Sequence, residues 1–228
     1  MLFAAAAGLI AIAQPAQASY TLSDLATGGS ISIGDKIFNN FAYQQSDLTG
    51  FDASQITVSA SIDPSGVYFL TFTGPIALAF AANNADLLLS YDVAATDGFI
   101  SMIDQKYTGG VFGSGVLSIT ETATSMGAPT VHSSVSHPYD VSDPDVFPNG
   151  TFDIGETDLL VVVPPQSALH VTKDIQFTTA DPFAFVHVSE ITQSFHQVPE
   201  PTTIVAGLAL LVPLGVSTLR ILRRSRVA

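Results

Sequence analysis

The middle of the chain alternates between apolar and polar residues, and turn-forming residues separate the alternating runs. Residues 56–62 have the sequence ITVSASI, which places every second side chain, from Ile56 onward, on the same face of a strand. The next four residues, Asp-Pro-Ser-Gly at 63–66, predict a turn. A second strand is then predicted over residues 67–73.

Similar runs recur along the chain at intervals typical of an all-β domain. They predict further strands at residues 85–94, 99–107, 115–124, 158–163, 169–178 and 183–195. With an apolar strand around Lys36, this gives about nine strands. We expect an antiparallel β-sandwich of jelly-roll type over residues 19–197. We also expect the last two strands to form a hairpin across residues 179–182, and a single helical turn at residues 22–26.

The N-terminal segment differs from this pattern. Residues 1–18 are mostly apolar and end in Ala16-Gln17-Ala18, an A-x-A cleavage signal. The apolar run is too short to span a bilayer, so it predicts a signal peptide comprising residues 1–18. A signal peptide normally has a Lys or Arg before its apolar run, and this segment has none. The alternative is a buried N-terminal helix.

The C-terminal segment, residues 198–228, has three parts in a fixed order. Pro199, Glu200 and Pro201 come first, and the apolar stretch Ile204 to Leu222 follows. A basic cluster closes the segment and comprises Arg220, Arg223, Arg224 and Arg226. The stretch is long enough for a transmembrane helix. Its arginines favour a cytoplasmic C-terminus, which agrees with an exported N-terminal part.

This order of motifs closely resembles the PEP-CTERM sorting signal of exosortase substrates. Thr202 stands where most members have serine. Gly34-Asp35-Lys36 with Phe38, and the segment Val171 to Ile175, are similar to segments of a recurrent group of such proteins. The resemblance implies transient anchoring in the inner membrane, processing by an exosortase near Pro199–Pro201, and a final place at the cell surface or outside the cell. The alternative is an ordinary single-pass anchor.

Charge and composition exclude several classes of function. Residues 19–198 carry three basic and nineteen acidic side chains, a net charge of −16. Such a domain would repel nucleic acid. The chain has no cysteine, which excludes disulfides, thiolate catalysis and cysteine-ligated zinc. Because Lys36 and Lys173 are rare positive charges in this domain, we expect each to form a structural ion pair rather than to act in catalysis.

The densest acidic region lies between residues 140 and 158. Asp140, Asp143 and Asp145 could supply oxygen ligands to calcium, although their spacing does not match an EF-hand. The alternative is a solvated acidic loop. The five histidines match no zinc motif, and no nucleophile or phosphate-binding motif is present.

We therefore expect a non-enzymatic surface or extracellular-matrix protein, associated with exopolysaccharide and without a resident cofactor. Two alternatives stay open: a secreted hydrolase that uses acidic side chains, and a calcium-dependent carbohydrate-binding module.

Overall fold

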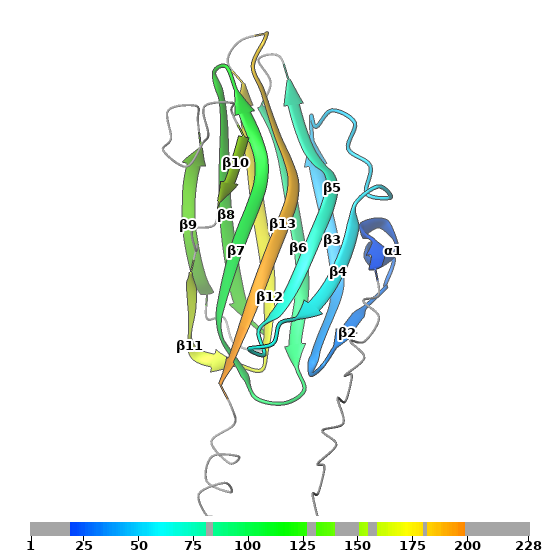
Figure 1. Ribbon diagram of the computed structural model, residues 1–228, viewed down its shortest axis with the longest axis vertical. Coiled ribbons are helices and arrows are strands. Elements are labelled where there is room, and N and C mark those ends of the chain that lie inside the picture. The colour runs from blue at the N-terminus through cyan, green and yellow to red at the C-terminus, as the bar shows by residue number, and fades with distance from the viewer. Residues whose placement is uncertain are drawn as a thin grey trace, which may run out of the picture.

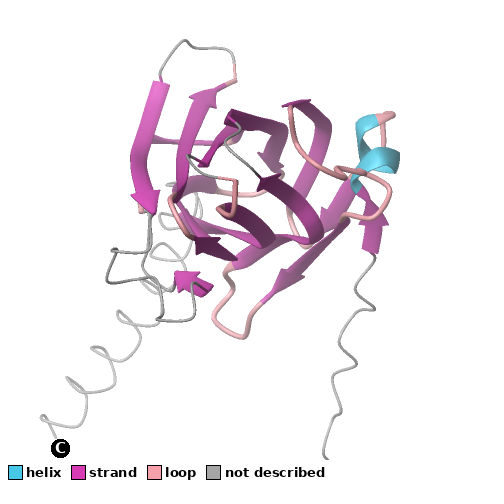
Figure 2. Ribbon diagram, turned by 90° about the horizontal axis from the view of Figure 1, so that it is seen from above, coloured by secondary structure: helices cyan, strands magenta, loops and turns pink. Residues whose placement is uncertain are grey.

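The computed structural model describes residues 19–80, 84–126, 131–139, 151–154, 159–179 and 182–198. Within this part of the chain, thirteen strands form two antiparallel sheets that face each other (Figure 1). The view along the strands shows the two layers (Figure 2). The predicted antiparallel β-sandwich is confirmed.

The first sheet, called sheet A, has seven strands. In order across the sheet they are β1 (Ser19–Thr21), β4 (Thr57–Ile62), β5 (Tyr68–Phe80), β13 (Phe185–Val198), β7 (Phe99–Phe112) and β10 (Thr151–Ile154), with β11 (Leu160–Gln166) also paired to β7. The second sheet, called sheet B, has six. They are β2 (Ile31–Ile33), β3 (Lys36–Ser46), β6 (Asn84–Ala95), β12 (Ala168–Thr179), β8 (Gly115–Ser125) and β9 (Val131–Tyr139).

The predicted strand positions agree with the structure, but the number of strands does not. The four strands that were not predicted are β1 and β2, of three residues each, β10, of four, and the nine-residue β9. A run of three residues is too short for alternation to be visible in the sequence. Residues 34 and 35 form the turn that joins β2 to β3, so the strand expected around Lys36 begins only at that residue.

The predicted hairpin between the last two strands is wrong. Strand β12 lies between β6 and β8 in sheet B, whereas β13 lies between β5 and β7 in sheet A. The chain therefore crosses from one layer to the other between them. Each is a long central strand with an apolar inner face. Because the two strands lie in opposite sheets, both apolar faces are buried in the core between the sheets.

Strand β11 also continues beyond its predicted end at Pro164-Pro165. Its pairing with β7 is irregular between Val161 and Gln166, which spans the two prolines. Because proline lacks the N–H needed for a regular ladder, the irregularity accommodates both residues within a strand at the sheet margin.

The core between the sheets is rich in aromatic side chains. Tyr91 on β6 packs against Phe38 and Phe41 of β3 and against Phe72 of β5, with ring centroids 5.6–6.4 Å apart. All four side chains are buried. Such offset and edge-on pairs add to the stabilisation that burial of apolar area provides.

The expected helical turn is confirmed as α1 (Leu22–Ala26). The Oγ1 of Thr21 accepts a hydrogen bond from the backbone N–H of Asp24 at 3.1 Å, which caps the helix start. Leu22 and Leu25 are buried and attach the helix to the edge of the sandwich.

Several predicted segments lie outside the described residues. These are the signal peptide at 1–18, the Pro199–Pro201 motif, the apolar stretch with its arginines, and the acidic residues Asp140, Asp143 and Asp145. In the described part of the chain, no helix has the length and hydrophobicity needed to cross a bilayer.

Candidate functional site

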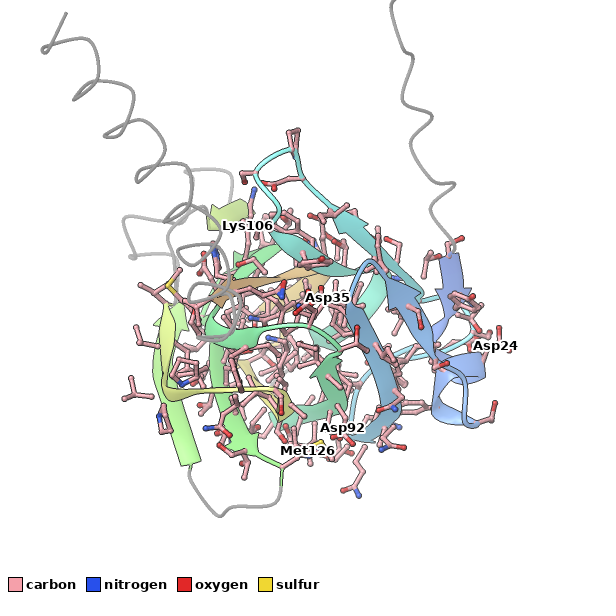
Figure 3. The ribbon with its side chains drawn as sticks, turned by 90° about the horizontal axis from the view of Figure 1, so that it is seen from below. Asp24, Asp35, Asp92, Lys106 and Met126 are labelled. Atoms are coloured by element: carbon pink, nitrogen blue, oxygen red, sulfur yellow. The ribbon has the colours of Figure 1, made fainter. Side chains whose placement is uncertain are left out.

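The outer face of sheet A carries a groove with a volume of about 420 Å³. Its lining comes from three neighbouring strands and from the turn between β4 and β5. Phe69 of β5, Lys106 of β7, and Thr192, Ser194 and His196 of β13 all contribute. Figure 3 shows Lys106 on this side of the sandwich, opposite Asp92 on the outer side of sheet B.

The wall formed by residues 63–67 is held by one carboxylate. The Oδ1 of Asp63 accepts hydrogen bonds from the backbone N–H of Ser65 at 2.9 Å and of Val67 at 2.8 Å. The hydrogen bonds from the Ser65 hydroxyl, together with these backbone bonds, lower the pKa of Asp63. The sequence Asp-Pro-Ser-Gly thus builds a fixed turn rather than a loose loop.

Polar groups in the groove can both donate and accept hydrogen bonds. The hydroxyl of Ser194 and Nε2 of His196 lie 3.3 Å apart, and the hydroxyl of Thr192 lies 3.3 Å from that of Thr71, which is outside the groove lining. Phe69 adds a half-buried aromatic ring. A ligand with hydroxyl groups and an apolar face would match this combination.

At the other end of the same face, three phenylalanines form a row across three strands. Phe185 of β13 is paired in register with Phe80 of β5 and with Phe112 of β7. The rings of Phe112 and Phe185 are stacked with centroids 4.1 Å apart, and Phe80 lies 5.9 Å from Phe185. Phe80 is 43% exposed, and the nearby Phe183 is 90% exposed.

His187 follows Phe185 on the same outer face. Its ring stacks on Phe185 at 6.1 Å and covers Gly110, where a Cβ atom would come within 2.6 Å of the imidazole. Burial lowers the pKa of His187. Gly110 lies inside β7, where the absence of a side chain makes room for the histidine.

A second polar cluster lies on the outer face of sheet B. Oδ1 of Asp92 is 2.6 Å from Nδ1 of His170, and Oδ2 accepts a hydrogen bond from the side chain of Asn40 at 2.6 Å. Asn40 sits at an irregularity of β3 with a φ of 52°. Asp92 is nearly buried, whereas the His170 side chain is 44% exposed. This arrangement orients the imidazole toward solvent.

Both expected lysine ion pairs are confirmed. Nζ of Lys36 lies 2.9 Å from Asp35 and 4.3 Å from the centre of the Tyr68 ring, and burial lowers its pKa. Lys173 pairs with Glu121 of β8 at 2.8 Å, and both side chains are fully buried. The sequence indicated that Lys173 would have a partner, but not which one.

The sequence-based site candidates and the structural ones do not coincide. The proposed calcium ligands and the sorting motif lie outside the described residues. Within the described residues, no group of three or more histidine and acidic side chains is arranged to hold a metal ion. The phenylalanine row was missed because its members are far apart in the sequence. The only signal for it was the outward position of Phe185 in the alternating run Phe-Val-His-Val.

No protein-family model and no curated protein matches the chain. Solved structures match at low identity. TmCBM61 in complex with β-1,4-galactotriose is 11% identical with a TM-score of 0.32, and the match covers 68% of this chain and 88% of that one. A structure of carbohydrate-binding modules from the β-sandwich superfamily is 12% identical with a TM-score of 0.33, covering 65% and 54%.

Another match is the enzymatically active domain of tailspike protein 4 of bacteriophage CBA120. It is 12% identical with a TM-score of 0.28, over 67% of this chain and 19% of the tailspike chain. Similarity at this level assigns neither a ligand nor an activity to this protein.

Proposed function

We propose that this protein is a non-catalytic glycan-binding protein that holds a polysaccharide along the outer face of sheet A. The observation that supports the proposal is that the polar groove and the phenylalanine row occupy the same face of β13 and β7. Sugar rings present an apolar face that stacks on aromatic rings, and their hydroxyls require donors and acceptors. Both are available along this one surface.

The dimensions suit a chain rather than a single sugar. Positions 185 to 196 of β13 connect the phenylalanine row to the groove, and at the rise of a strand they span about 35 Å. That length accommodates several sugar units. The net charge of −16 over residues 19–198 favours a neutral glycan over a polyuronate, which would be repelled.

Binding can be measured by affinity electrophoresis of the full-length chain in detergent, against a panel of neutral and anionic polysaccharides. Phe185→Ala and Phe112→Ala should each weaken binding about tenfold, because each removes a stacking surface. Tyr20→Ala is the matched control, since Tyr20 is 39% exposed on edge strand β1, away from the row. Equal binding by all variants would refute the proposed surface.

We further propose that the protein reaches the cell surface by exosortase-dependent sorting, after transient anchoring in the inner membrane. The support is in the sequence: Ala16-Gln17-Ala18, the Pro199–Pro201 motif, and the apolar stretch ending in arginines. Mass spectrometry of the surface form, from cells with and without an exosortase, tests this. An intact C-terminus in both kinds of cell would contradict processing by an exosortase and would indicate an ordinary single-pass anchor.

A second candidate function is hydrolysis on the opposite face, favoured by the Asp92–His170 pair. An aspartate that orients an exposed imidazole is the arrangement of a general base. A screen for glycan and ester hydrolysis distinguishes the two proposals. Turnover that is lost in His170→Ala but retained in His187→Ala would favour a hydrolase.

A further inference from the structure

Four polar side chains meet at the centre of the sandwich, where apolar residues would be expected. Lys173 of β12 and Glu121 of β8 come from sheet B, and Gln105 of β7 and Gln193 of β13 come from sheet A. Three of them are fully buried and Gln105 is 3% exposed. A buried ion pair of this kind contributes little net stability compared with apolar packing, so its presence requires another explanation.

The amine of Lys173 is surrounded by groups that could react with it. Its Nζ lies 2.8 Å from Oε1 of Glu121 and 2.6 Å from Oε1 of Gln105, and it also contacts Oε1 of Gln193. A carboxylate and two carboxamides thus lie within hydrogen-bond distance of the amine, in a site buried between the two sheets.

Gln105 and Gln193 differ in their other partners. The hydroxyl of Tyr107 donates a hydrogen bond to Oε1 of Gln105, so two donors polarise that carbonyl. A donor at this position would also stabilise the negative charge that develops on the oxygen during attack at Cδ. The amide of Gln193 instead donates to the carbonyl oxygen of Asp104 at 2.9 Å, which fixes its orientation. Gln105 is therefore the better electrophile, and Gln193 positions the amine.

We propose that Lys173 and Gln105 form an intramolecular isopeptide bond between Nζ of the lysine and Cδ of the glutamine. Glu121 takes one proton from the ammonium, and the neutral amine attacks Cδ. The tetrahedral intermediate collapses with breakage of the Cδ–Nε2 bond, while a second proton from Nζ passes to the leaving nitrogen. One molecule of ammonia leaves, and Glu121 retains its proton. No oxidant, metal or cofactor is needed.

Two features of the site favour this reaction. Holding amine and amide together in the folded core replaces a slow bimolecular aminolysis with a unimolecular step. The products also leave no charge in the core, because the ammonium becomes an amide nitrogen and Glu121 becomes neutral. The reaction thus removes the desolvation cost of the buried pair.

The bond would connect the two layers of the sandwich. Residue 105 lies on a central strand of sheet A and residue 173 on a central strand of sheet B, so the link crosses the core. The chain has no cysteine, and such a link restricts the unfolded chain in the way a disulfide does.

Mass spectrometry of the full-length, denatured chain tests the proposal. The chain should be lighter than its sequence mass by one ammonia, and trypsin should not cut after Lys173. The peptides containing Gln105 and Lys173 should be recovered as one covalent species. A wild-type chain of full mass, cut normally at Lys173, would overturn the proposal and leave a structural ion pair. A link mapped to Gln193 would overturn the assignment of Gln105.

Variants test the roles of the individual groups. Lys173→Met and Glu121→Gln should both restore the full sequence mass, the first by removing the nucleophile and the second by removing the proton acceptor. Lys36→Met is the matched control, because Lys36 is equally buried and paired but contacts Asp35 rather than a glutamine. It should keep the mass deficit. A deficit that persists in Lys173→Met would also refute the proposal, and the wild-type mass decides the question even if a variant fails to fold.

Discussion

At the scale of single residues, two glycines with left-handed backbone angles differ in how much space surrounds them. Gly74 within β5 and Gly66 in the β4–β5 turn both have positive φ angles, of 137° and 87°. A Cβ at Gly74 would come within 2.6 Å of the carbonyl oxygen of Gln55, whereas a Cβ at Gly66 would meet nothing within 4 Å.

Gly74→Ala should therefore lower the free energy of unfolding considerably more than Gly66→Ala. Both substitutions incur a strained backbone of about 1–3 kcal/mol, but only the first also pushes apart two backbone segments. Urea unfolding followed by circular dichroism measures both. Equal losses of stability would contradict the close packing at Gly74.

Asp86, on the outer face of sheet B, makes the stability of the fold depend on pH. Burial, together with the charge of Asp174 on the neighbouring strand, raises its pKa. The folded protein therefore holds a proton on Asp86 more tightly than the unfolded chain does. As pH rises above about 3.8, ionisation of Asp86 lowers the stability of the folded state.

Asp86→Asn should raise the free energy of unfolding at pH 7 by about 0.2–1 kcal/mol, because it removes repulsion between two carboxylates on adjacent strands. The gain should disappear in melts at low pH, where Asp86 is protonated in the folded and the unfolded chain. Asp174→Asn should give a similar gain, and the double variant little more than either one. Additive gains in the double variant would show that the two carboxylates do not interact.

At the scale of elements, an irregularity in β13 determines which side chains face the groove. Pairing shifts between Val188 and Glu190 on both neighbouring strands. Outward positions are odd-numbered before the shift, as in Phe185, and even-numbered after it, as in Thr192. Without the extra residue, the alternation would expose Ile191 and Phe195 and bury the groove residues.

The turn between β4 and β5 provides a test at the same scale. Asp63→Ala should weaken glycan binding, because the turn that its carboxylate holds forms one wall of the groove. Asp52→Ala is the matched control, since Asp52 makes similar bonds, to the N–H and hydroxyl of Ser54 at 2.9 and 2.6 Å, and is absent from the groove lining.

Both variants should lose stability, and in both the loss should be present at pH 7 and vanish at low pH. Each carboxyl has a pKa lowered by these hydrogen bonds, so its contribution to stability disappears as pH falls through that pKa. Affinity electrophoresis at pH 7, with thermal melts at pH 7 and at a series of pH values falling below 3.8, separates the two effects. Equal glycan binding by the two variants would argue against the turn as a wall of the site.

At the scale of the whole molecule, net charge is the dominant feature. Residues 19–198 carry a charge of −16, so like charges repel throughout the folded domain. At physiological ionic strength, salt screens surface charges beyond about 8 Å. Added salt should therefore stabilise the domain whether or not a specific ion is bound.

We expect the melting temperature to rise by the same amount in calcium chloride, magnesium chloride and sodium chloride of matched ionic strength. This is the outcome of screening alone. A larger increase of the melting temperature in calcium chloride than in the other salts would instead indicate a calcium site. Its loss in the double variant Asp143→Asn, Asp145→Asn would assign that site to the acidic segment. The variants distinguish a bound ion from general screening.

The alternation of apolar and polar residues was enough to predict most strands and the sandwich class. It was enough because a strand that covers a core must bury every second residue, and this requirement is visible in one segment at a time. The scarcity of lysines likewise predicted that Lys36 and Lys173 would have acidic partners. Short strands such as β1 were not predicted, since three residues carry too little pattern.

Only the tertiary structure decided which segments meet. The hairpin expected between β12 and β13 is replaced by strands in opposite sheets, and this change of layer brings Lys173 to Gln105, 68 positions earlier in the chain. The row of Phe80, Phe185 and Phe112 also exists only through cross-strand register. The physical reason is that alternation fixes which face of a strand is buried, whereas strand order and register depend on the packing of the whole core.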